Sequence, residues 1–282
     1  SRQGSVSPAG RVHCSPPFLC SPSTTSPDRT LGVSSAFTAF LRAVLALLGD
    51  VHDFLQPMRD LLDRLPRQVR AVIQVGDLCV WPEAEDAPPM PDGSPRELPR
   101  RPRDPSLHWR RPPRDMLWID GNFHPYCLTR GLTTPTRVAP GLVYLPRGTV
   151  ATLPGRAGPL RVGVLGGADS VHDAHVRRLG DDWWPEEERV GVADVERLLT
   201  NARAAGGLDL LVTHTPPASV TTVMTPGGAP HPSAVLVEEA WRALGGGVAD
   251  PPLELICGHM HEGWRSDRLR VEVLPILGVA IR

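Results

Sequence analysis

The chain has 282 residues and a formal net charge of −1, and 41% of its residues are hydrophobic. This length and composition suit one large or two small globular domains with a sizeable core. The balanced charge excludes a domain that binds nucleic acid through an overall positive charge. No apolar run reaches the ~18 to 20 residues that cross a bilayer, and the N-terminal segment lacks the apolar centre of a secretory signal. We therefore expect a cytoplasmic protein without a membrane segment.

Residues 1–36 are rich in serine, proline and threonine and show neither helical nor strand periodicity. Such a composition buries too little apolar surface to offset the entropy lost on ordering, so we predict a disordered tail. The remaining residues, 37–282, are predicted to form one domain.

Apolar stretches of strand length alternate with helical patterns along this domain. Helices are predicted at 54–65, 193–206 and 233–247, and strands at 41–50, 70–77, 115–122, 142–148, 160–167, 208–214, 253–259 and 269–276. Continuous apolar runs are typical of strands covered on both faces, whereas the alternation in the last stretch favours a place nearer a sheet edge. The order of elements predicts a layered α/β domain.

An insertion rich in proline and arginine, at about residues 83–114, interrupts this order. Its prolines are incompatible with a regular helix. Two interpretations stay open for it: a solvated surface loop, or an arginine-lined rim that attracts phosphorylated substrates. The second would also allow a nucleic-acid end-processing enzyme, whose binding would weaken steeply with salt.

Five of the predicted strands end directly before potential metal ligands. In an open α/β sheet the carboxyl ends of the strands meet at one crevice, so these side chains are expected to converge. Imidazole nitrogens combined with carboxylate and amide oxygens suit a divalent metal such as Mn, Fe or Zn. The set is too large for one ion and suits two ions that share a carboxylate, an arrangement used for displacement at phosphorus. Its members are Asp50, His52, Asp77, Asn122, His214, His259 and His261.

Each of these residues also has an ordinary structural explanation. Asp50 can form a turn or cap a helix, His214 can be a hydrogen-bonded core histidine, and Asn122 can occupy a turn with positive φ. The joint order and spacing of the set favour metal binding over these separate explanations.

Five short motifs at the strand ends resemble, in order, the signatures of the calcineurin-like metallophosphoesterase superfamily. They are GDVH at 49–52, GD at 76–77, GN at 121–122, THTPP at 213–217 and GHMH at 258–261. The resemblance spans roughly residues 41–282, and the flanking stretches are similar to a bacterial and phage subgroup. It implies an α/β fold built as a four-layer α/β/β/α sandwich with a dinuclear metal centre.

The resemblance also implies a role for each ligand. Asp50, His52 and His261 would hold the first ion, Asp77 would bridge, and the second ion would be held by Asn122, His214 and His259. A hydroxide between the ions would attack the phosphorus of a phosphomonoester or phosphodiester. The substrate would be a phosphorylated small molecule or nucleotide, and nucleic acid is the weaker alternative.

The third motif departs from the superfamily pattern, which usually reads Gly-Asn-His. Phe123 occupies the position of that histidine and His124 follows it. A phenyl ring cannot transfer a proton, so general acid catalysis, worth roughly 10²- to 10⁴-fold in rate, is in question. His124 can act as the proton donor. Alternatively, the enzyme uses good leaving groups or another donor, such as His172, His175 or an arginine of the insertion. The third interpretation is a catalytically weak or inactive scaffold for interactions.

Overall fold

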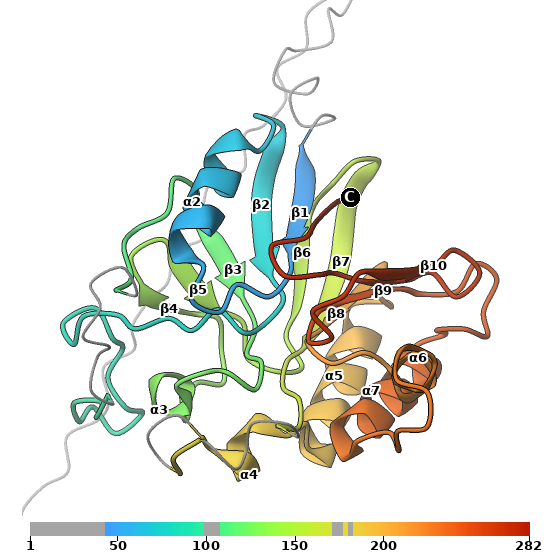
Figure 1. Ribbon diagram of the computed structural model, residues 1–282. Helices are drawn as coiled ribbons and strands as arrows, with labels where there is room; N and C mark the ends of the chain where they lie inside the picture. Colours follow the sequence, from blue (N-terminus) through green and yellow to red (C-terminus); the bar gives the residue numbers. More distant parts are fainter. Residues whose placement is uncertain (1–42, 99–107, 171–176, 180–182) are drawn as a thin grey trace, which may run out of the picture.

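The computed structural model describes residues 43–98, 108–170, 177–179 and 183–282. The predicted disordered tail lies outside these ranges. The described chain forms a mixed α/β structure with two six-stranded β-sheets (Figure 1).

The first sheet has four parallel strands in its centre and one antiparallel strand at each edge. Across the sheet the order is β12 (Val279–Ile281), β1 (Val44–Leu48), β2 (Val69–Gln74), β3 (Met116–Trp118), β5 (Leu142–Tyr144) and β4 (Thr136–Ala139). Because β1, β2 and β3 are parallel, the loops that follow them leave the sheet at the same end.

The second sheet repeats this plan, with four parallel strands between two antiparallel edge strands. Its order is β10 (Trp264–Ser266), β11 (Val271–Val273), β9 (Glu254–Cys257), β8 (Leu210–Thr213), β7 (Gly158–Leu165) and β6 (Val150–Gly155). The loops after β7, β8 and β9 therefore also leave their sheet at a common end.

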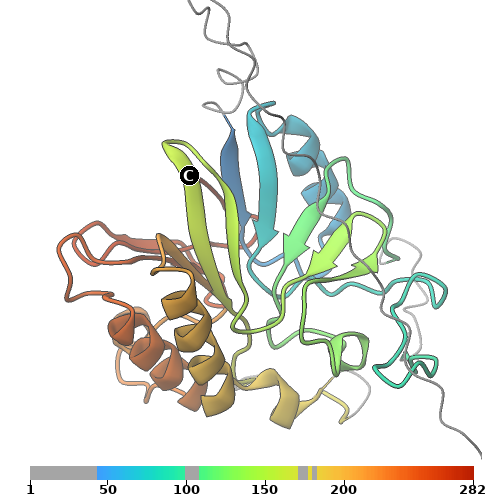
Figure 2. The same cartoon turned by 180° about the vertical axis from the view of Figure 1, so that it is seen from behind.

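Helices lie beside each sheet (Figures 1 and 2). They pack against it through apolar side chains. Leu55, Met58 and Leu62 recur at helical spacing in α2 and join a buried cluster with strands of the first sheet. A second buried cluster unites side chains of α5, α6 and α7 with strands of the second sheet. The helices are α2 (Leu55–Arg64), α3 (Tyr126–Thr129), α4 (Pro185–Glu188), α5 (Val192–Ala204), α6 (Ala218–Met224) and α7 (Pro232–Ala243).

Alternating side chains of the central strands enter different parts of the core. In β1, Ala46 and Leu48 belong to the cluster beneath α2. Leu45 and Leu47 belong to a third cluster, which contains residues of both sheets. This alternation follows from the two-residue period of a strand and explains the continuous apolar run in the sequence, because both faces are covered.

The eight predicted strands and three predicted helices all correspond to observed elements. Four of these elements begin one or two residues before the predicted range, and all end one to four residues before the predicted end. The prediction that 269–276 lies nearer an edge is confirmed, since β11 lies next to the edge strand β10. The strands and helices that the sequence did not predict are short, from three to seven residues. Such lengths give too little periodicity to recognise.

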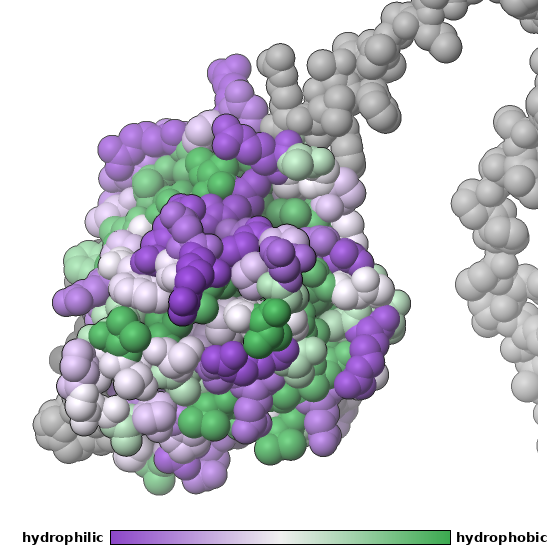
Figure 3. Space-filling view, turned by 90° about the vertical axis from the view of Figure 1, so that its right-hand side faces the viewer, coloured by the Kyte–Doolittle hydropathy of each residue, from purple (hydrophilic) through white to green (hydrophobic). Residues whose placement is uncertain are grey.

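The described residues of the insertion contain turns but neither helix nor strand. Arg96 is largely buried there and donates hydrogen bonds to four backbone carbonyls, those of Pro88, Pro89, Cys127 and Arg130. On the face shown in Figure 3, hydrophobic and hydrophilic residues are interspersed. Within the described ranges, every helix is too short or too polar to span a bilayer.

Candidate metal centre

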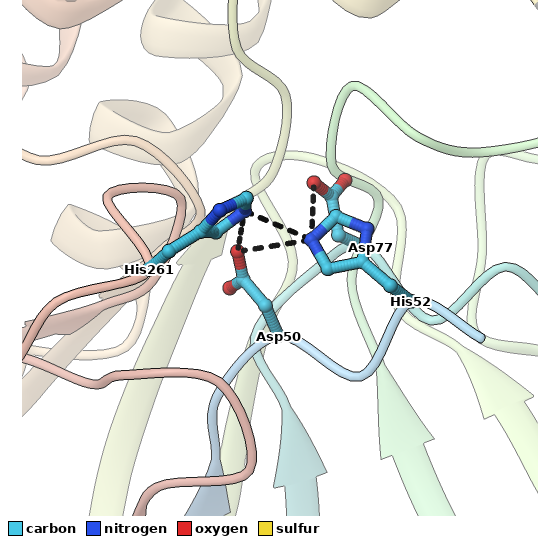
Figure 4. A group of neighbouring side chains, drawn as sticks. All are labelled: Asp50, His52, Asp77 and His261. Atoms are coloured by element: carbon cyan, nitrogen blue, oxygen red, sulfur yellow. Dashed lines mark hydrogen bonds and ion pairs between the residues drawn. The ribbon is translucent and has the colours of Figure 1, made fainter. Parts of the chain in front are cut away.

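The loops after five parallel strands bring potential metal ligands together from both sheets. Two groups have ligand atoms that all lie within 4.8 Å of one another: Asp50, His52, Asp77 and His261, and Asp77, His214 and His259. Asp77 belongs to both groups. Figure 4 shows the first group, in which side chains from three separate loops point toward one another.

In the first group, three ligand atoms face a common point. Asp50 Oδ2 lies 3.3 Å from His261 Nε2 and 3.8 Å from His52 Nε2. The two Nε2 atoms are 2.9 Å apart. Between neutral imidazoles, one nitrogen of such a pair presents a lone pair. Two nitrogens and a carboxylate oxygen converging in this way form a suitable set of donors for one cation.

Asp77 lies between the two groups and presents one oxygen to each. Its Oδ2 is 3.9 Å from His52 Nε2, and its Oδ1 is 3.4 Å from His214 Nε2. The Phe123 backbone N–H donates to Oδ1 over 2.7 Å and fixes the orientation of the carboxylate. The side chain is therefore held with one oxygen toward each group of histidines.

In the second group, a backbone carbonyl orients His214. His214 Nδ1 lies 2.9 Å from the oxygen of Val75, which can only accept a hydrogen bond, so Nδ1 carries the proton. Nε2 lies 3.2 Å from Asn122 Oδ1 and 3.4 Å from Asp77 Oδ1, and in the neutral ring its lone pair is available to a cation bound beside these oxygens. Fixing the tautomer through the other ring nitrogen is typical of histidines that bind metal.

The backbone of the site is held in an uncommon conformation. Seven non-glycine residues of the described chain have positive φ, and four of them are His52, Asp77, His259 and His261. Residues held in this way cost about 1 to 3 kcal/mol each and concentrate at functional sites. The His52 N–H donates to the Asp77 carbonyl over 2.7 Å and so joins two of the loops.

Two glycines allow the ligand loops to approach closely. A Cβ at Gly121 would lie 2.0 Å from Asp77 Oδ1, and a Cβ at Gly258 would lie 2.1 Å from Asp50 Oδ1. Neither separation is possible between real atoms. The glycine that precedes a ligand in one motif thus makes room for the carboxylate of another, which explains why these motifs contain glycine.

The electrostatics of the site follow from two buried carboxylates. Asp50 and Asp77 are 0% and 1% exposed, and their charged neighbours among the described residues are histidines. Burial raises the pKa of Asp77, but His214 and His52 outweigh it and lower this pKa well below its usual range. Burial lowers the pKa of His214, yet Asp77 and Asp50 raise it to about 9. Burial and the neighbouring His214 lower the pKa of His259 to about 4.

These observations fit a divalent metal centre. The buried negative charge needs a compensating cation, and the only positive charge that the described neighbours offer is a proton on histidine. The donors are imidazole nitrogens with carboxylate and amide oxygens, a set that suits first-row divalent metals.

The neighbouring buried carboxylate, Asp120, is compensated differently and was not singled out in the sequence. Arg147 Nε donates to Asp120 Oδ2 over 2.8 Å, and the Tyr144 hydroxyl donates to Oδ1 over 3.0 Å. Arg147 also donates to backbone carbonyls of α4 and the residue after it. This pair has no local sequence signature, because its members come together only through the fold.

His124 lies beside the site but faces the core. It is 3% exposed, and its ring centroid lies 4.5 Å from that of Trp118 and 4.6 Å from that of Tyr126. Its Nε2 is 2.8 Å from Thr129 Oγ1, and burial lowers its pKa to about 3. In this arrangement the ring is not among the residues that line the cleft beside the metal ligands.

Phe123, which stands where the superfamily pattern has histidine, lines this cleft. Its ring meets that of His52 edge-on at 5.3 Å, and the Arg177 guanidinium lies 4.3 Å from its centroid. The alternative donors His172 and His175 lie outside the described residues. The arginines Arg96 and Arg114 of the insertion donate to backbone carbonyls and do not line the cleft.

The cleft has a volume of about 620 Å³ and begins at the candidate ligands. Ser170, which follows β7, lies on its wall and accepts a hydrogen bond from Asn122 Nδ2 over 3.1 Å. Thr215, in the THTPP motif, and residues of α6 and the segment after it complete the wall. The sequence showed no signal for the segment after α6, because its glycine and proline content indicates only a loop.

No family model and no curated protein matches the chain. Among solved structures, a match is the crystal structure of phosphopantetheinyl hydrolase (PptH) from Mycobacterium tuberculosis. It is 15% identical, covers 83% of this chain and 90% of that chain, and has a TM-score of 0.38. The ligand geometry, and not this similarity, supports a metal centre.

Proposed function

We propose that the protein is a metal-dependent phosphoesterase that hydrolyses a phosphomonoester or phosphodiester. The observation that carries the proposal is the position of Asp77. Its two carboxylate oxygens face separate groups of histidines. This is the arrangement expected of a carboxylate shared by two ions.

The proposed ligands divide into two sets around that carboxylate. Asp50, His52 and His261 form the first set, and Asn122, His214 and His259 form the second. When bound, two divalent ions would lower the pKa of a water molecule and neutralise charge on the phosphoryl oxygens. Mn, Fe and Zn are the metals that suit this donor set.

The protein's own residues would hold the geometry of the reaction. The Val75 carbonyl fixes the His214 tautomer and the Phe123 N–H fixes the Asp77 carboxylate. Phe123 supplies an apolar surface beside the ligands and no proton. Because Phe123 and the buried His124 are poorly suited to donate a proton, we expect esters with good leaving groups to react fastest.

The proposal includes a calcineurin-like α/β/β/α arrangement of the two sheets and their helices. Three buried clusters support it: one joins α2 to the first sheet, one joins α5, α6 and α7 to the second, and one contains residues of both sheets. In this arrangement the loops after the parallel strands of both sheets would meet at one rim.

The test is hydrolysis of aryl phosphomonoesters and phosphodiesters by the purified protein with Mn²⁺. We expect turnover by the wild type and none above background by Asp77→Ala. A Phe123→His variant separates this activity from an interaction scaffold that has lost its proton donor. If the wild type does not exceed the Asp77→Ala background while Phe123→His gains activity, the scaffold is the correct interpretation.

A further inference from the structure

The cleft beside the candidate metal ligands extends well past them. It reaches from Asp77 and His259 to the end of α6 and the segment 225–231. Its volume, about 620 Å³, lies within the ~300 to 1,000 Å³ usual for sites that bind small molecules. A phosphoryl group at the ligands would fill only one end, so the rest of the cleft is available to the organic group of an ester.

The wall formed by α6 and residues 225–231 is partly apolar, and its one ionisable side chain is the imidazole of His231. It contains threonine hydroxyls, a thioether, a proline ring and small residues that expose backbone. These residues are Thr221, Met224, Thr225, Gly228, Ala229 and Pro230. Phe123 adds an aromatic ring at the other end, next to His52.

The described lining contains no arginine, and the chain has no lysine. Outside the proposed ligands, the acidic side chains on the wall are Asp169 and Glu262. Asp169 is balanced by Arg189, whose Nε is 3.2 Å from Oδ1, and accepts the Ser233 N–H over 2.9 Å. Glu262 is exposed and adds negative charge to the cleft.

Arg177 lies near the cleft but adds no exposed positive charge to its wall. It stacks on Phe123, donates to the Asn122 carbonyl over 2.9 Å and lies 3.6 Å from the Glu188 carboxylate. Its side chain is 4% exposed, so its charge is balanced inside the protein. Outside the proposed ligands, His231 is the one ionisable nitrogen on the described wall, so a second anionic group on a substrate would meet the negative charge of Glu262 with neither arginine nor lysine to offset it.

We infer that the site acts on phosphoesters whose organic group is uncharged and partly apolar, and that α6 and residues 225–231 contact this group. The inference rests on the proposed phosphoesterase activity. It favours phosphorylated alcohols with alkyl or hydroxyalkyl chains over nucleoside polyphosphates and esters that bear carboxylates.

The experiment compares matched compounds that differ by one carboxylate. Phosphate release from butyl phosphate and from 3-carboxypropyl phosphate gives the preference in kcat/KM with Mn²⁺. Calorimetric binding of the two corresponding phosphonates, which are not hydrolysed, gives the preference in affinity. We expect the uncharged compound to be favoured roughly tenfold in both measurements.

Variants on α6 provide matched positive charges. Met224→Arg places a cation on the wall and is expected to reduce the preference about tenfold. Val223→Arg is the control, because Val223 is the preceding residue, is 60% exposed and does not line the cleft. It should leave the preference unchanged within about twofold. Thr225→Arg, at an exposed wall position, replaces Met224→Arg if that variant does not fold.

The outcomes separate the inference from the proposed activity. A binding preference for the uncharged phosphonate without any turnover supports the inferred specificity and contradicts the proposed phosphoesterase activity. Turnover with equal or better use of the carboxylated ester overturns the specificity and leaves the phosphoesterase function standing. Identical preferences in the Met224→Arg and Val223→Arg variants, or no binding of either phosphonate, also overturn the specificity.

Discussion

Asp77 and Asp120 are two buried aspartates that follow neighbouring parallel strands, β2 and β3. Asp120 is paired with the guanidinium of Arg147 and with the Tyr144 hydroxyl. Asp77 contacts imidazoles and one backbone N–H in the described structure. The same residue type, at the same end of the same sheet, thus has a permanent cation in one case and only ionisable neighbours in the other.

The difference shows how a structural carboxylate can be told from a candidate metal ligand. A buried carboxylate needs a compensating charge. Arginine remains protonated, so the Asp120 pair is complete within the protein. Imidazoles are mostly neutral near pH 7 unless their pKa is raised, and they offer lone pairs when deprotonated. The Asp77 group is therefore completed either by a proton on His214 or by a metal.

The largest expected effect comes from removing the shared carboxylate. Asp77→Asn should decrease metal-dependent hydrolysis by more than the roughly 10- to 100-fold typical of residues that only support a ligand. The measurement is kcat/KM for an aryl phosphate with Mn²⁺. Activity within a few-fold of wild type would mean that Asp77, like Asp120, has only a structural role.

Asp120→Asn should give the opposite pattern. It removes the closer of the two carboxylates that contact the largely buried Arg147, the other being Asp194 at 3.3 Å. Breaking a buried pair costs up to roughly 3 to 5 kcal/mol of unfolding free energy. Urea unfolding measures this loss. Variant protein that remains folded should still bind Mn²⁺, and a loss of metal without a loss of stability would reverse the roles assigned to the two aspartates.

Metal removal should destabilise the wild type through the Asp77 group and not through the Asp120 pair. A ligand at 100 times its dissociation constant stabilises the folded state by about 2.7 kcal/mol. Mn²⁺ should therefore raise the unfolding free energy of wild type by about this amount, and a chelator should reverse the effect. Asp77→Asn should lose most of this response and Asp120→Asn should keep it. Equal responses in both variants would place the bound metal elsewhere.

The smallest expected effect concerns His124. The pH dependence of the unfolding free energy tests whether its ring is buried in the neutral form. Its folded-state pKa of about 3 lies below the ordinary value of 6.5, so the unfolded chain binds the proton first as the pH falls. The associated stability is present above pH 6.5 and is lost as the pH falls from 6.5 toward 3. By linkage the loss is about 2 kcal/mol at pH 5.

The variant His124→Phe should lack this part of the acid destabilisation in urea unfolding at pH 7 and pH 5. It should also keep hydrolysis of an aryl phosphate if His124 is not the proton donor. An equal pH dependence in both proteins would contradict the burial of the neutral ring, and loss of hydrolysis in folded variant protein would restore His124 as the donor.

The sequence predicted the parts of this molecule that depend on local pattern. The strand before Asp77 has an apolar centre, Ala71–Ile73, and the ligand lies three residues after the end of the strand at Gln74, so both were visible without coordinates. The partner of Asp120 was not visible, because Arg147 is 27 residues away and nothing near it indicates a pair. The orientation of His124 was also hidden, since a one-residue change along a loop redirects a side chain in a way that no spacing rule describes.

The residues that line the cleft could also be predicted only in part from the sequence. Phe123 was recognised because it occupies a motif position, whereas Met224 and Thr225 lie at a helix end whose place beside the ligands depends on packing of α6 against the second sheet.

Anomalous X-ray diffraction from crystals grown with Mn²⁺ tests the central claim most directly. We expect two anomalous peaks, one on each side of the Asp77 carboxylate, within coordinating distance of the two sets of histidines. Crystals that bind Mn²⁺ only at surface carboxylates, with no peak at Asp77, would contradict it.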